Sequence, residues 1–71
     1  MTLIGQSILR APDGTRWVVS TVASGREFVT TARRTGCDLT PAATVRSATP
    51  AEAEAAHRRH RESIQRHGRP A

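Results

Sequence analysis

The chain has 71 residues, of which 37% are hydrophobic, with one Trp, one Phe and no Tyr. Its eleven basic side chains, all arginine, outnumber six acidic ones and give a formal charge of +5 at pH 7. This length excludes a multidomain protein and leaves a marginal core, so stable folding needs idealised packing, a metal or a partner chain. The positive charge favours polyanionic partners.

The start of the chain and its cysteine content bear on location. Residues 1–9 have no basic segment and no long apolar run, so we expect no signal peptide. No apolar run approaches the roughly 18 residues of a transmembrane helix. Cys37 is the single cysteine, which excludes an intrachain disulfide and fits a reducing compartment. We expect a cytoplasmic protein with no membrane contact.

The first half of the chain is expected to form short antiparallel strands. Residues 2–10 predict a strand that is partly buried on both sides, with a bulge or bend at Gly5. Residues 11–14, Ala-Pro-Asp-Gly, predict a hairpin turn, because proline presets φ and glycine accepts a positive φ. Residues 15–24 and 26–34 are rich in β-branched side chains and predict two more strands.

Alternation within these strands predicts the buried face. Trp17 and Val19 share one face of the second strand, and Phe28 lies on one face of the third, so we expect the two faces to meet in the core. The alternative for Trp17 is an exposed ring that stacks on a nucleic-acid base.

The segment between the third strand and the helix is less regular. Pro41 excludes a central strand at its position. We expect Leu39 in a short strand, a tight turn after it, and a last short strand at 44–47. Four or five short strands predict a small antiparallel meander or an SH3-like, partly open barrel over residues 1–48.

Residues 49–67 carry the signals of a helix start and stop. Thr49 is the expected N-cap, Pro50 the first helical residue, and Glu52 completes a capping box. Gly68 suits a left-handed cap at the other end. We therefore expect a basic helix at about residues 50–67, followed by a flexible tail at 68–71. The predicted fold class is mainly β with one C-terminal α-helix.

The helix presents two faces at 100° per residue. One face is weakly apolar, so we expect only its first half to dock on the sheet, through Ala53 and Ala56. On the opposite face, residues 54, 58, 62 and 66 alternate acid and base and predict a ladder of ion pairs. The expected partner-facing surface consists of His57, His60, Ile64 and His67.

Arginine is the preferred side chain for bidentate contacts to phosphate. An alternative explanation for the absence of lysine is the codon bias of a GC-rich genome, and an alternative for the arginines is a solvated surface with scattered charge. The candidate nucleic-acid-binding residues are Arg16, Arg26, Arg33, Arg34, Arg46, Arg59, Arg61 and Arg69.

The sequence contains no catalytic motif, and we expect no enzyme activity and no cofactor. Cys37 precedes Asp38, whose charge disfavours a reactive thiolate. The three histidines line one helix face, but His67 lies about 10 Å along the helix from His60. A metal centre needs three or four ligands around one point, so we predict none.

The leading hypothesis is a nucleic-acid-binding accessory module that holds the phosphate backbone through arginine. The alternative is a protein-interaction module. In that case the β domain or the Ala/His/Ile helix face docks on a larger acidic partner, such as a transcription, translation or phage–host complex. Self-association would also complete the thin core.

Overall fold

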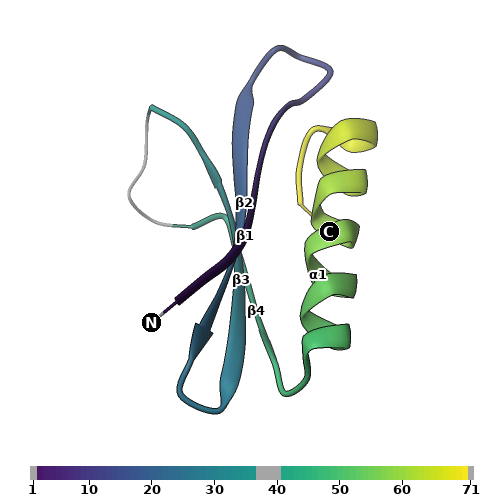
Figure 1. Ribbon diagram of the computed structural model, residues 1–71. Helices are drawn as coiled ribbons and strands as arrows, with labels where there is room; N and C mark the ends of the chain where they lie inside the picture. Colours follow the sequence, from purple (N-terminus) through teal and green to yellow (C-terminus); the bar gives the residue numbers. More distant parts are fainter. Residues whose placement is uncertain (1, 37–40, 71) are drawn as a thin grey trace.

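The computed structural model describes residues 2–36 and 41–70. It contains β1 (Thr2–Arg10), β2 (Arg16–Ser24), β3 (Glu27–Arg34), β4 (Ala43–Ser47) and α1 (Pro50–His67). All neighbouring strands are antiparallel, in the order β1-β2-β3-β4, and α1 lies along one face of the sheet (Figure 1). The predicted meander is confirmed, whereas the SH3-like barrel is not formed because β1 and β4 remain separate edges. The strand expected around Leu39 falls outside the described residues.

The hairpin between β1 and β2 forms where the sequence predicted it. Gly14 has a φ of 90°, and its N–H donates to the carbonyl oxygen of Ala11 at 2.9 Å. The backbone N–H of Thr15 donates to Oδ1 of Asp13 at 2.9 Å. These bonds set the pairing of the two longest strands, so that Leu9 lies opposite Trp17.

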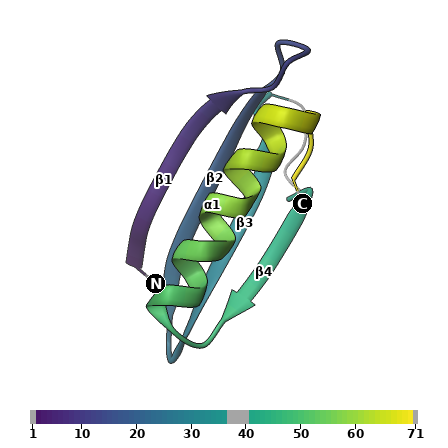
Figure 2. The same cartoon turned by 90° about the vertical axis from the view of Figure 1, so that its right-hand side faces the viewer.

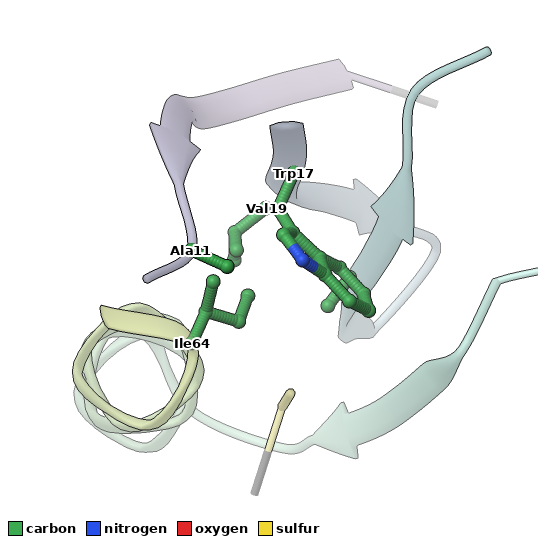
Figure 3. Packing of buried hydrophobic residues seen from close by; sticks show 5 residues of the cluster. Ala11, Trp17, Val19 and Ile64 are labelled. Atoms are coloured by element: carbon green, nitrogen blue, oxygen red, sulfur yellow. The ribbon is translucent and has the colours of Figure 1, made fainter. Parts of the chain in front are cut away.

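The core lies between the sheet and the helix. Trp17 and Val19 come from the covered sheet face, and Ile64 meets them from α1 (Figure 3). Ala32 on the same sheet face belongs to this cluster. Phe28 lies opposite Ala23 on that same face, so the predicted meeting of the Trp17 and Phe28 faces is confirmed. Trp17 is only 4% exposed, and the alternative of an exposed, base-stacking ring is therefore wrong.

The helix packs on the sheet along its whole length, which corrects the expectation that only its first half docks. Ala53, Ala56, His60 and Ile64 are all buried. The reason is a match of lengths. A nine-residue strand spans about 30 Å, and an 18-residue helix spans about 27 Å. The sheet is thus long enough to cover the outer half of α1 as well.

Both ends of α1 are capped as the sequence predicted. The N–H of Glu52 donates to Oγ1 of Thr49 at 3.2 Å. Gly68 adopts φ 76°, and its N–H donates to the carbonyl oxygen of Ile64 at 2.9 Å. Ser63 Oγ donates to the carbonyl oxygen of Arg69 at 2.7 Å, so the start of the expected tail is tied back to the helix. No helix in the described part of the chain is long and apolar enough to cross a bilayer.

Candidate functional site

One face of the sheet carries α1, and the other, here called the open face, is covered by no helix or strand of the described residues (Figure 1). The pairing of the strands arranges its side chains in rows across the sheet. Two rows contain apolar residues, a polar row lies between them, and one end is basic. In order along the sheet, the rows are Ser24 and Glu27; Leu3, Val22, Val29 and Arg46; Gln6, Ser20, Thr31 and Thr44; Ile8, Val18 and Arg33; and Arg10 with Arg16.

Three arginines gather at the hairpin end of the open face and are here called the arginine cluster. Arg10 lies directly opposite Arg16, and Arg33 lies opposite Val18, diagonal to Arg16. Diagonal neighbours on a sheet have Cα atoms about 7–8 Å apart. All three side chains are exposed, and none forms an ion pair within 4 Å among residues 2–36 and 41–70.

Further arginines lie at the same end of the molecule. Arg34 follows Arg33 at the end of β3, and its charge affects the pKa of Asp13. Hydrogen bonds from Thr15 lower the pKa of Asp13 below its ordinary value, and the charge of Arg34 lowers it further. Gly68 lies against the β1–β2 turn, which brings the last turn of α1 to this end. We call the following set the basic end: Arg10, Arg16, Arg33, Arg34, Arg66 and Arg69.

The other predicted arginines lie away from the basic end, so the eight candidates do not form one continuous surface. Arg26 lies in the turn at the opposite end of the sheet, and Arg46 is paired with Glu27. Arg59 and Arg61 are on α1, on the far side of the sheet from the open face. Arg10 was not in the predicted set. Its position directly before the hairpin turn is the signal that could have indicated it, because this position places it opposite Arg16.

His57 connects the helix to three strands through hydroxyl groups. Its Nε2 lies 2.9 Å from Oγ of Ser7 on β1, and its Nδ1 lies 3.1 Å from Oγ1 of Thr21 on β2. Thr21 Oγ1 lies 3.0 Å from Oγ1 of Thr30 on β3. Burial lowers the pKa of His57, and the charge of Arg61 lowers it further, which favours the neutral imidazole at pH 7. One ring nitrogen therefore donates and the other accepts.

His60 is buried one turn further along the helix. It is 2% exposed, and neither ring nitrogen has a hydrogen-bond partner in the described structure. Burial lowers its pKa, and the charge of Arg59 lowers it further. Nε1 of Trp17 is likewise buried without a partner. An unpaired buried polar group is rare and costs stability.

The histidine face of α1 is therefore not the predicted partner-facing surface. His60 and Ile64 are covered by the chain's own sheet, and His57 is partly covered, while His67 remains exposed. The packing of the outer half of α1 is the reason for this correction. Within the described ranges, no three His, Cys, Asp or Glu side chains gather as metal ligands. The predicted ladder on the outer face also has no pair within 4 Å in that part of the chain.

A groove of about 470 Å³ lies between the first half of α1 and the strands β1, β2 and β3, and it is here called the β1 groove. Ile4, Phe28 and Pro50 supply apolar lining, and Arg58 and Arg61 stand along the helix side. The remaining lining residues are Gly5, Thr21, Ala53, Glu54 and His57.

The contact between Ser7 and His57 has the separation of a nucleophile and its base. In hydrolytic triads, however, a carboxylate orients the imidazole, whereas the second ring nitrogen of His57 meets the Thr21 hydroxyl. The arginine cluster can bind an anion.

Comparisons of this chain with protein-family models, with curated proteins and with solved structures found no match.

Proposed function

We propose that this chain is a small module that binds nucleic acid through contacts between arginine and the phosphate backbone. The observation that carries the proposal is the cross-strand pair of Arg10 and Arg16, with Arg33 beside it. Like charges directly opposite each other destabilise a sheet. A bound phosphate would relieve this repulsion, and guanidinium groups bind phosphate through two parallel hydrogen bonds.

The proposed contact is to phosphate rather than to bases. Proteins that bind single strands by stacking present aromatic rings on the contact surface. Trp17 and Phe28 both lie on the helix-covered face, so the open face offers no ring. Contacts to phosphate carry no sequence information by themselves. We therefore expect binding with strong salt dependence and weak sequence preference, in a cytoplasmic protein.

Salt titration tests the mode of binding. Fluorescence anisotropy with a labelled DNA duplex, and with single-stranded DNA and RNA of equal length, gives the association constant at each salt concentration. Each phosphate contact on a duplex contributes a slope of about −0.9 in log K against log salt, so three contacts predict about −2.7. An association constant that stays flat across this range contradicts the proposal.

A pair of triple variants tests the location. Arg10→Gln/Arg16→Gln/Arg33→Gln removes the cluster, and Arg26→Gln/Arg59→Gln/Arg61→Gln removes the same charge elsewhere. We expect the cluster variant to lose most of the affinity and about three contacts of salt slope. The control variant should lose much less, and circular dichroism should show both folded. Equal losses would mean that net charge alone drives binding.

A second candidate function is docking on an acidic protein. It is favoured by the half-buried valines Val18, Val22 and Val29, which lie on the open face beside the arginines. Arginine beside an apolar patch is a composition typical of protein interfaces. Affinity capture from native lysate, with and without nuclease, separates the two functions. A protein that stays bound after nuclease treatment, and is lost with Val18→Asp, supports the second.

A further inference from the structure

The two edges of the sheet differ in how they are protected. β4 is five residues long, carries Arg46 and begins shortly after Pro41. β1 is nine residues long, and its sequence from residue 2 to residue 9 contains neither charge nor proline. In Figure 2, β1 lies at one side of the sheet with no described segment beside its outer edge. Natural proteins normally protect a free edge with charge, proline or a short strand.

The exposed large apolar side chains of the described structure all lie on this edge strand. Leu3 is 57% exposed, Ile4 58% and Ile8 72%. In the rest of the described chain, the large apolar side chains are buried or half-buried. A strand that adds to a free sheet edge covers the side chains exposed there. Leucine and isoleucine concentrated on an unpaired strand are therefore typical of an edge that binds another strand.

Apolar surface is present on both sides of the β1 edge. Leu3 and Ile8 lie on the open face. The strand register shifts between Leu3 and Gly5, and Ile4 at this irregularity lines the β1 groove on the helix side. Gly5 lies at this irregularity, which confirms the bulge predicted at that residue.

We propose that β1 pairs antiparallel with β1 of a second copy of this chain, so that the two sheets form one continuous eight-stranded sheet. The occupant must be a strand, because the edge offers unpaired backbone N–H and C=O groups. A second copy supplies a strand of equal length with the same neutral, apolar residues. A two-fold axis relates the two copies, as in most homodimers.

Charge placement favours this pairing over a face-to-face dimer. Arg10 is at one end of β1, and antiparallel pairing sends the two Arg10 side chains to opposite ends of the seam, up to about 30 Å apart. Face-to-face packing of two open faces would instead desolvate both arginine clusters, which is costly without paired acids. In the edge-paired dimer both clusters stay exposed on the same open face.

The pairing also accounts for the β1 groove. A two-fold axis perpendicular to the sheet places both helices on one face, so the two grooves border the seam from either side. Ile4 of each copy then lies between the two helices and is covered there. The partner copy thus closes the β1 groove. This pairing is separate from any function of the arginines on the open face.

The first test is the molecular mass in solution, measured by sedimentation equilibrium without nucleic acid from micromolar to near-millimolar concentration. We expect twice the chain mass at the upper concentrations. Leu3→Lys/Ile8→Lys adds two charges to the β1 edge and should yield monomer. Thr44→Lys/Ala48→Lys adds the same charge at and beyond the β4 edge and should remain dimeric. A wild-type chain that is monomeric throughout, or a dimer that only the β4 variant disrupts, overturns the proposal.

Disulfide trapping tests the geometry. Gln6 is the middle residue of β1 and lies near the proposed two-fold axis. In a Cys37→Ser background, Gln6→Cys should give a covalent dimer on mild oxidation, and Thr44→Cys should not. A dimer that cross-links through residue 44 but not residue 6 contradicts pairing through β1. Because neither measurement includes nucleic acid, both stand apart from the proposed function.

Discussion

His57 Nε2 lies 2.9 Å from Ser7 Oγ, and this contact joins the helix to an edge strand fifty residues earlier in the chain. Through Nδ1 the same ring contacts Thr21, whose hydroxyl contacts Thr30. One neutral imidazole thus holds α1 against β1 and β2 directly, and against β3 through the two threonines. In a core with few large apolar residues, this polar connection fixes where the helix sits.

Replacing His57 should therefore destabilise the fold. His57→Ala removes both ring contacts and leaves the buried hydroxyl of Thr21 with one partner fewer. We expect a loss of about 1–3 kcal/mol in the free energy of unfolding, measured by urea denaturation. His67→Ala, at the exposed end of the helix, is the matched control and should change it by less than about 0.5 kcal/mol. Equal effects would show that the hydroxyl contacts do not hold the helix.

Replacing His60 should have the opposite effect. Both of its ring nitrogens are buried without a partner, which costs stability. His60→Leu replaces the imidazole with an apolar side chain of similar size. We expect the free energy of unfolding near neutral pH to rise by about 1 kcal/mol. A clear fall in stability would mean that the imidazole makes a favourable contact through a bound water.

Stability should fall on acidification. Burial lowers the pKa of His57 and His60 below the ordinary value of 6.5, with contributions from Arg61 for His57 and from Arg59 for His60. The sheet groups that contact His57 are the hydroxyls of Ser7 and Thr21, and neither ring nitrogen of His60 has a hydrogen-bond partner in the described structure. The unfolded chain therefore takes up protons first as the pH falls below about 6.5, which favours unfolding.

The melting temperature should accordingly stay level above about pH 6.5 and drop between about pH 6.5 and pH 5. Differential scanning fluorimetry across this range measures the effect. The double variant His57→Gln/His60→Leu should show a flatter profile, because neither position then titrates. A wild-type melting temperature that rises on acidification would be incompatible with neutral, buried histidines.

The outer half of α1 should prove essential for stability. Ile64 is fully buried against Val19, Ala11 and Trp17 (Figure 3). Ile64→Ala should cost about 2–5 kcal/mol, a large part of the total for a chain of this length. The adjacent exposed residue provides the control, and Gln65→Ala should be nearly neutral. Chemical denaturation of the two variants measures the difference, and similar midpoints would mean that this half of the helix is not docked.

The N-cap contributes a smaller, separable amount. Thr49→Ala removes the hydroxyl that accepts from the N–H of Glu52 and should cost about 1 kcal/mol. Thr49→Ser keeps the acceptor and should restore most of that stability. Helix content followed by circular dichroism during thermal unfolding measures both. Identical unfolding of the two variants would exclude a role for the cap.

The arginine cluster was predictable in part. Strand alternation indicated that Arg16 and Arg33 lie opposite the Trp17 face, and the open face has both. The predicted set also joined them to arginines of the helix, which the structure places on the other side of the sheet. Arg10 entered the site only through pairing across the hairpin, because a register of two strands cannot be read from either strand alone.

The sequence by itself determined the local elements, since each depends on neighbouring residues. Proline and glycine set the turns, β-branched residues the strands, and Thr49 and Gly68 the limits of the helix. The tertiary structure alone decided which surfaces are covered. It buried His60 and Ile64 beneath a sheet as long as the helix, and it left Leu3, Ile4 and Ile8 on an unpaired edge. Both outcomes depend on how distant segments pack, and the periodicity of one segment does not contain that information.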